Sequence, residues 1–176
     1  MKHLKMIVLG LIAISFSGCT DDLLDIHFGL NVKEVTYTLQ PTQQAGDIVL
    51  DPMTQPINLD SIATANGANL GKVKSVKIKK LTVIHESPAT GNFDILSSGF
   101  FTVEATDLPL IHVADFTHTA DGSKEMELTP TDADLLEYGK KPMLTIAGKL
   151  TTNGPLTEAT KVRLRIEFEV TANPLK

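Results

Sequence analysis

The sequence predicts an all-β fold, an antiparallel β-sandwich with immunoglobulin-like or Greek-key connections, about 7–9 strands and one or two short helical connections. Three observations support this prediction. Apolar and polar residues alternate with a period of two, turn-forming residues separate the alternating runs, and helical patterns are few and short. A chain of 176 residues, 42% hydrophobic and 21% charged, suits one globular domain. A closed barrel is the alternative architecture.

The clearest alternation lies in residues 161–170. Every second position there is apolar: Val162, Leu164, Ile166, Phe168 and Val170. Because the intervening residues are charged, we expect one face of this strand to be buried and the other to be solvated. Residues 143–150 follow the same pattern, and the turn residues Asn153-Gly154-Pro155 come after them. We expect these two runs to pair as a hairpin with a long loop.

Shorter alternating runs predict the remaining strands. They lie at 33–39, 47–51, 100–106, 110–117 and 124–129. Asp107-Leu108-Pro109 and Asp121-Gly122-Ser123 have the composition of turns. Two short helices are expected between strands. One is capped by Asp60 and ends at Ala65 before Asn66-Gly67, and the other starts at Thr129–Asp132 and ends at Tyr138 before Gly139.

The run 72–85 is irregular. Val76 and Ile78 occupy even-numbered positions, whereas Leu81 and Val83 occupy odd-numbered positions. In a regular strand the two pairs would therefore face opposite sides. Either a bulge near position 80 returns all four side chains to one face, or the strand crosses from one sheet to the other.

The same run is rich in lysine, with Lys72, Lys74, Lys77, Lys79 and Lys80. These lysines suit contact with anionic headgroups or an acidic polysaccharide. We favour the alternative interpretation, in which they protect an exposed edge strand from pairing with another chain.

Histidines are the strongest candidates for chemistry, and they do not form a recognisable site. If 110–117 is a strand, His112 and His118 lie about 20 Å apart at about 3.3 Å per residue, and Asp115 points to the opposite face. That spacing prevents local binding of one zinc ion. Whether His112, Asp115 and His118 form any site is left open.

Motifs of known enzyme classes are also missing from the sequence. It contains no Gly-x-Ser-x-Gly, His-Glu-x-x-His, Gly-x-Gly-x-x-Gly or P-loop pattern. We therefore predict a protein that is not an enzyme, with no catalytic, cofactor-binding or metal-binding residue. The alternative is a lipid-anchored hydrolase or metal-dependent enzyme that uses His85, His112, His118 and nearby carboxylates.

Aromatic residues are scarce, because the chain has no Trp and only two Tyr. Sugar-binding and protein-binding surfaces commonly use such side chains. Phe100-Phe101 is the one candidate platform, since adjacent strand residues face opposite sides and one of the two rings can be exposed. The alternative that we favour is that both rings are buried, one in each of two packing layers.

The N-terminus has the organisation of an export signal. Lys2 and Lys5 precede an apolar stretch of 11 residues, 6–16, which is too short to span a bilayer. Phe16-Ser17-Gly18-Cys19 then brings small residues to the only cysteine, which excludes an internal disulfide. This segment resembles the lipobox of bacterial lipoproteins, and the whole chain resembles small uncharacterised lipoproteins of the Bacteroidetes type. The resemblance implies that 1–18 is a signal peptide and that Cys19 is lipidated.

The resemblance also implies the organisation and location of the rest of the chain. Residues 19–32 then form the lipidated Cys and a short tether, and 33–176 form the β-sandwich domain. The protein is expected in the cell envelope, anchored by palmitate or similar acyl chains, in the outer membrane. Asp21 and Asp22 favour display on the surface over a periplasm-facing position.

The net charge of the chain indicates which classes of binding partner to expect. Removal of 1–18, which contains two Lys and no acidic residue, changes the net charge from −5 to −7. An acidic domain of this kind does not suggest nucleic-acid binding. We expect the membrane to be a partner through the lipid anchor, an envelope protein or polysaccharide to be the second partner, and no cofactor. The predicted function is that of a non-enzymatic binding or structural module.

Overall fold

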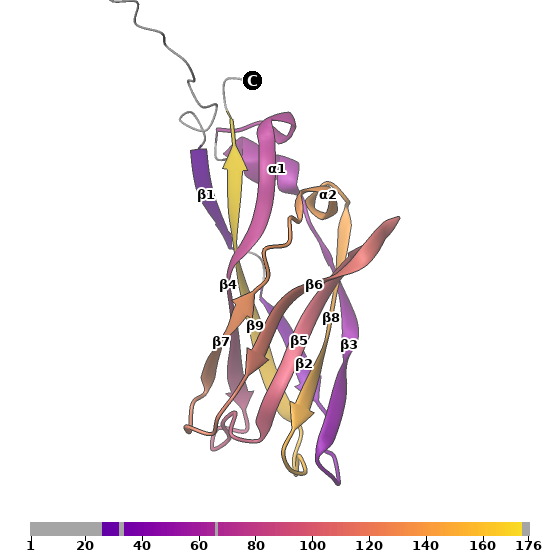
Figure 1. The fold of residues 1–176 in the computed structure, drawn as a ribbon, viewed down its shortest axis with the longest axis vertical. Helices are drawn as coiled ribbons and strands as arrows, with labels where there is room; N and C mark the ends of the chain where they lie inside the picture. The colour runs from indigo at the N-terminus through magenta and orange to yellow at the C-terminus, as the bar shows by residue number, and fades with distance from the viewer. Residues whose placement is uncertain (1–25, 32–33, 66, 174–176) are drawn as a thin grey trace, which may run out of the picture.

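A computed structural model describes residues 26–31, 34–65 and 67–173 (Figure 1). The strands are β1 (Ile26–Asn31), β2 (Val35–Leu39), β3 (Gly46–Pro56), β4 (Val73–Ser87), β5 (Leu96–Ala105), β6 (Leu108–Thr117), β7 (Glu125–Pro130), β8 (Met143–Thr152) and β9 (Thr160–Ala172). The helices are α1 (Leu59–Ala65), a 3-10 turn η2 (Leu70–Lys72) and α2 (Leu136–Gly139). The prediction of an all-β, antiparallel fold is confirmed.

The strands pair in a nested order, in which strands from the two ends of the sequence pair with each other and the innermost pair is consecutive in sequence. β2 pairs with β9, β3 with β8, β4 with β7, and β5 with β6. Lateral pairing of β4 with β9 and of β5 with β8 then forms two layers, β2–β9–β4–β7 and β6–β5–β8–β3. This is the strand order of a jelly roll, which is a Greek-key sandwich, rather than the order of an immunoglobulin domain.

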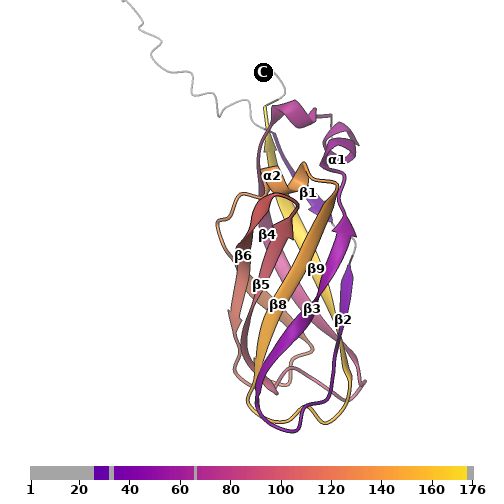
Figure 2. The ribbon, with the colours of Figure 1, turned by 90° about the vertical axis from the view of Figure 1, so that its right-hand side faces the viewer.

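The two layers are joined along one edge and separate along the other. On the joined edge, β6 pairs with β7 at Ala114↔Pro130 and Asp115↔Thr129. On the other edge, β2 and β3 lie side by side (Figure 2), and no ladder pairing links them within the described ranges. The fold is therefore a sandwich that is nearly closed, with one open edge.

The core lies between the layers and is built by the alternation seen in the sequence. Inward positions of β9 such as Leu164 and Val170 are buried, as are Leu144, Ile146 and Leu150 of β8. The expected hairpin between these two strands is wrong, because β8 pairs with β3 and β5 whereas β9 pairs with β1, β2 and β4. Alternation determines which face of a strand is buried, and it does not identify the neighbouring strand.

The irregular run is one continuous strand with a bulge. The register of β4 against β9 shifts between Ile78 and Lys80, and Val76, Ile78, Leu81 and Val83 are all buried. The predicted interruption near position 80 is confirmed, and its cause is the bulge, because β4 stays paired with β9 on both sides of it.

Both predicted helices are present, with differences at their ends. The Asn58 side chain caps α1 by accepting a hydrogen bond from the Ser61 backbone N–H at 2.8 Å, so Asp60 lies in the first turn and is not the cap. The second helix is shorter than expected, because β7 continues to Pro130 and α2 begins only at Leu136. The Asp134 carboxylate accepts the Leu136 N–H at 2.9 Å there.

The N-terminal strand lies inside the range expected to be a tether. β1 pairs with the end of β9, with Ile26 opposite Ala172. The predicted signal peptide 1–18 and the predicted lipidation site Cys19 lie outside the described residues. Within the part of the chain that the structure describes, no helix is long and apolar enough to cross a membrane.

Candidate functional site

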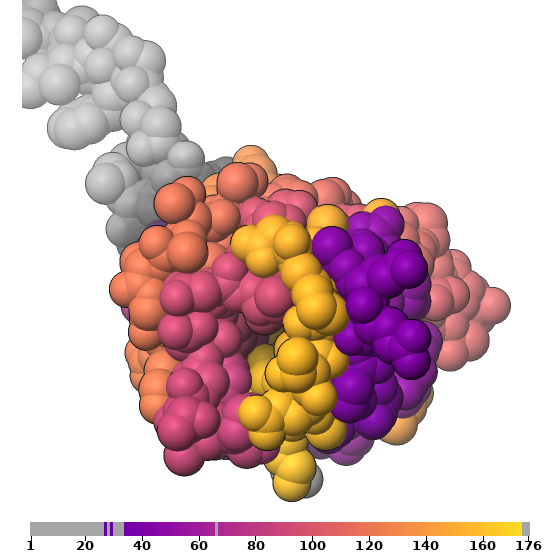
Figure 3. Space-filling view, turned by 90° about the horizontal axis from the view of Figure 1, so that it is seen from below, coloured from indigo at the N-terminus to yellow at the C-terminus, as the bar shows by residue number. Residues whose placement is uncertain are grey.

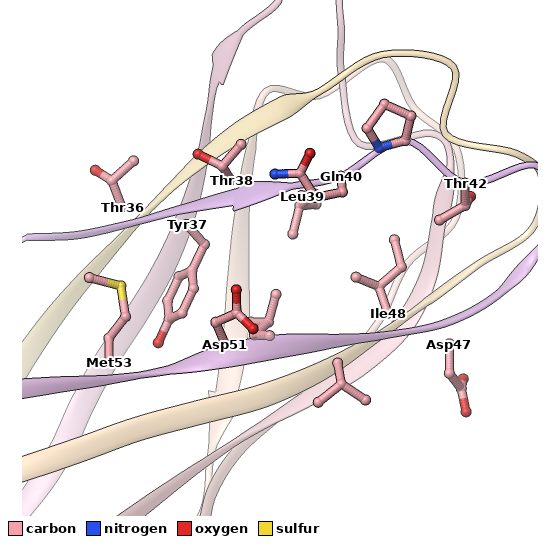
Figure 4. Close-up of a pocket in the computed structure, with 13 residues that line it drawn as sticks. Thr36, Tyr37, Thr38, Leu39, Gln40, Thr42, Asp47, Ile48, Asp51 and Met53 are labelled. Carbon is pink, nitrogen blue, oxygen red and sulfur yellow. The ribbon is translucent and has the colours of Figure 1, made fainter.

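The open edge of the sandwich contains a groove of about 460 Å³ between β2 and β3 (Figure 4). It is lined by Thr36, Tyr37, Thr38, Leu39, Gln40, Pro41, Thr42, Asp47, Ile48, Val49, Leu50, Asp51 and Met53. Within the described ranges, each of these strands has a ladder partner on one side only, so alternate backbone N–H and C=O groups of both strands are directed toward the groove.

The base of the groove is apolar and includes one buried phenol. Tyr37, Leu39 and Leu50 are each less than 5% exposed. The Tyr37 hydroxyl donates a hydrogen bond to the backbone carbonyl oxygen of Ile146 on β8 at 3.0 Å. Burial raises the pKa of Tyr37 to about 12, so the phenol is protonated and remains a donor at neutral pH.

The rim of the groove is polar and carries two carboxylates with different surroundings. Asp47 accepts hydrogen bonds from Lys149 Nζ and Thr151 Oγ1, each at 2.8 Å, and these bonds lower the pKa of its carboxyl group. Asp51 lies at a bulge where the register between β3 and β8 shifts, and its carboxylate is directed toward β2 (Figure 4). Asp51 has no hydrogen-bond or ion-pair partner among the described residues.

The chemistry of this groove suits binding rather than proton transfer. None of its lining residues is His, Cys, Lys or Ser, and Asp47 is already ionised and paired. The exposed edge backbones suit an extended polypeptide, because main-chain hydrogen bonds provide affinity when a strand is added to a sheet. Val49 adds an apolar contact at the rim, since its side chain is 74% exposed.

A second, smaller hollow lies at the end of the sandwich where the β4–β5 and β8–β9 loops meet (Figure 3). Its volume is about 180 Å³. His85 lines it and is buried against the edge of the Phe93 ring, with 5.7 Å between ring centroids. Burial, with a smaller contribution from Lys124, lowers the pKa of His85.

The structure corrects the predicted geometry of the histidine segment. A bulge in the pairing of β5 with β6 falls at Val113, so that Val113 and Ala114 are both buried. His112 and Asp115 therefore share the outer face, with His112 Nε2 2.9 Å from Asp115 Oδ1, instead of pointing to opposite faces. His118 lies just after β6 and approaches Asp121, with 3.8 Å between its Nε2 and Asp121 Oδ1.

The arrangement required by the enzyme alternative does not occur in the described ranges. Two histidines and an acid would have to converge, and the one cluster of three possible ligands there contains a single histidine, His118, with Asp94 and Asp121. His85 lies at the base of its hollow, and His112 lies on the outer face of β6.

The two adjacent phenylalanines face opposite sides of β5 as expected, but only one of the two is fully buried. Phe101 is in the core at 2% exposure, whereas Phe100 is half-buried on the outer face. The Phe100 ring contacts His112 edge-on, with 5.2 Å between centroids, and Lys149 Nζ lies 5.8 Å from its centroid. This ring is covered by neighbours of its own chain and does not form an open platform.

The lysine-rich part of β4 is neutralised in part by the chain itself. Lys77 Nζ lies 2.6 Å from Asp132 Oδ1, and Lys80 Nζ lies 3.0 Å from Glu127 Oε2. The segment before α2 also covers this edge of β4, because the Val76 N–H donates to the Asp134 carboxylate at 3.0 Å. The favoured interpretation of an exposed edge strand is wrong for β4 as a whole, because β4 pairs with β9 on one side and with β7 on the other. The ion pairs of Lys77 and Lys80 within the chain leave less of their charge for a polyanion.

No family model matches the sequence, and no curated protein matches it. Among solved structures, the chain is similar to the structure of infectious bursal disease virus Gt strain, with 12% identity and a TM-score of 0.40 over 97% of this chain. It is also similar to Desmodium yellow mottle tymovirus, with 8% identity and a TM-score of 0.27 over 100% of this chain and 98% of that one. The chain spans 37% of the length of the first of these proteins.

Proposed function

We propose that the protein is a lipid-anchored lipoprotein of the bacterial cell envelope and acts as a non-enzymatic binding module through the β2–β3 groove. The lipobox-like segment Phe16-Ser17-Gly18-Cys19 supports the anchor and an outer-membrane location. The observation that carries the binding role is the open edge. Within the described part of the chain, β2 and β3 have unpaired outer edges there, on the two sides of a groove of about 460 Å³.

The proposed occupant is an extended segment of a partner protein that adds as a strand along β2. The free edge of β2 is continuous over Val35–Leu39, whereas the edge of β3 is interrupted by a bulge that includes Pro52, which has no N–H to donate. Asp51 favours a Lys or Arg on the incoming strand, because a cation there would pair with a carboxylate that is directed into the groove.

Site-specific crosslinking in intact cells tests this proposal. A photoreactive amino acid replaces Val49 in the full chain, and the same substitution at Leu110 on β6 is the control. Leu110 is also well exposed, at 57%, and does not line the groove. We expect position 49 to crosslink to one segment of a single envelope protein, identified by mass spectrometry, and Leu110 to give no such adduct.

Charge reversal provides the second arm of the experiment. Asp51→Lys places a cation where the incoming strand is expected to carry one, so the yield of the adduct from position 49 should fall several-fold. Identical adducts from positions 49 and 110, an adduct with polysaccharide, or a yield that Asp51→Lys leaves unchanged would each overturn the binding role of the groove.

A further inference from the structure

Two loops lie together at the end of the sandwich opposite α1 and α2, the β4–β5 loop and the β6–β7 loop (Figure 1). Three of their side chains meet there. Asp94 belongs to the β4–β5 loop, His118 follows the last residue of β6, and Asp121 belongs to the β6–β7 loop. One ligand atom from each, a ring nitrogen or a carboxylate oxygen, lies within 4.8 Å of the other two.

The His118 ring is buried without a partner for one of its nitrogens. Its side chain is 8% exposed, and Nε2 has no hydrogen-bond partner within the described structure. The 3.8 Å between Nε2 and Asp121 Oδ1 is too long for a hydrogen bond. A buried polar atom without a hydrogen-bond partner is unfavourable, and a bound cation would supply the missing partner.

The carboxylate of Asp94 is held in place before any ligand arrives. Its Oδ1 accepts the backbone N–H groups of Asp121 and Gly122 at 2.9 and 2.8 Å, and its Oδ2 accepts Asn92 Nδ2 at 3.1 Å. Hydrogen bonds of this kind commonly orient the carboxylates that bind metals.

We propose that Asp94, His118 and Asp121 bind one divalent transition-metal ion of the Zn²⁺ class. One imidazole and two carboxylates suit zinc, whereas Ca²⁺ and Mg²⁺ prefer oxygen ligands alone. Metal–ligand bonds of about 2.1 Å at tetrahedral angles separate neighbouring ligand atoms by about 3.4 Å, close to the observed gap between His118 and Asp121. The Asp121 side chain is 61% exposed, so water can reach the fourth position.

Calorimetric titration of Zn²⁺ into the metal-free full-length chain in detergent tests the site. We expect one ion per chain with micromolar affinity, and little competition from millimolar Ca²⁺. His118→Ala and Asp121→Asn should each weaken binding about tenfold or more. Thermal unfolding of each variant without metal shows that it is folded, and Asp121→Asn keeps the oxygen that accepts the Ser123 N–H.

His112→Ala is the matched control. His112 and Asp115 have the same residue types and the same spacing as His118 and Asp121, but their side chains are 46% and 56% exposed and no third ligand is grouped with them among the described residues. The proposal holds if both site variants weaken Zn²⁺ binding and His112→Ala does not. Any other result overturns it, including adventitious binding that is equal in all four proteins or no saturable binding below millimolar Zn²⁺.

Discussion

The hydroxyl of Tyr37 on β2 donates a hydrogen bond to the backbone carbonyl oxygen of Ile146 on β8, with 3.0 Å between the two oxygens. The two residues belong to different layers of the sandwich and are 109 positions apart in the sequence. At the open edge, where no strand pairing joins the layers within the described ranges, this bond links them directly.

Tyr37→Phe removes the hydroxyl group that makes this hydrogen bond and keeps the aromatic ring. We expect the variant to unfold with a free energy lower by about 1 kcal/mol, the usual net value of one such bond, or somewhat more because the Ile146 carbonyl stays buried. Chemical denaturation at neutral pH measures the difference. An unchanged midpoint and slope would show that the bond does not contribute to stability.

The wild type and Tyr37→Phe should also differ in how their stability changes at alkaline pH. The pKa of Tyr37 is raised from 10.0 to about 12 on folding, so its protonated form is favoured in the folded state. The resulting stability is complete below pH 10 and is lost as the pH rises through the folded pKa. Between pH 10 and pH 12 the wild type should therefore lose more stability than Tyr37→Phe, and parallel curves would contradict this.

Substitutions at Phe101 and Phe100 compare how much the inner and outer faces of β5 contribute to stability. Phe101→Ala should cost about 3–5 kcal/mol, because the ring is 2% exposed and its removal leaves a cavity. Phe100→Ala removes a half-buried ring from the outer face and should cost much less. Urea unfolding of both variants gives the comparison, and similar losses would mean that the outer ring matters as much as the core ring.

Gly148 on β8 allows close packing of β5 and β8. A Cβ atom there would lie 2.7 Å from the Phe100 carbonyl oxygen, so Gly148→Ala should destabilise the fold by about 1–3 kcal/mol. Gly29→Ala is the control, because its added Cβ would lie 3.8 Å from the Phe168 carbonyl oxygen. Thermal unfolding should separate the two variants, and an equal change in both would refute the packing argument.

The proposed anchor is tested at Cys19. Cys19→Ala should abolish labelling with a radioactive or clickable fatty acid and move the protein from the membrane fraction to the soluble fraction, because acyl chains supply the membrane affinity. Ser17→Ala keeps a small residue before the cysteine and should behave as the wild type. Labelling that persists in Cys19→Ala would rule out lipidation at this residue.

Alternation in the sequence was enough to predict which residues face the core and that one strand is interrupted near position 80, by a bulge or by a crossing between sheets. Val76, Ile78, Leu81 and Val83 required a shift near position 80, and β4 has it. A similar signal at Val113-Ala114, two adjacent apolar residues in an alternating run, indicates the bulge that brings His112 and Asp115 together, and the sequence prediction overlooked it.

Strand neighbours and the sites that depend on them could not be predicted in this way. The groove exists because β2 and β3 face each other without pairing, and alternation carries no information about partners. The cluster of Asp94, His118 and Asp121 depends on two loops meeting, with Asp94 and Asp121 separated by 27 positions. Neither position belongs to a motif with a fixed spacing, so only the fold brings them together.

The nested pairing has a consequence for the order in which the chain can fold. The hairpin of β5 and β6 forms from neighbouring residues, whereas β2 must wait for β9, so that Val35 meets Leu164 only after all the residues between them have been synthesised. Long-range pairing of this kind is slow. During that interval β2 lacks its ladder partner on β9, and an unpaired strand of this kind exposes a nascent chain to aggregation.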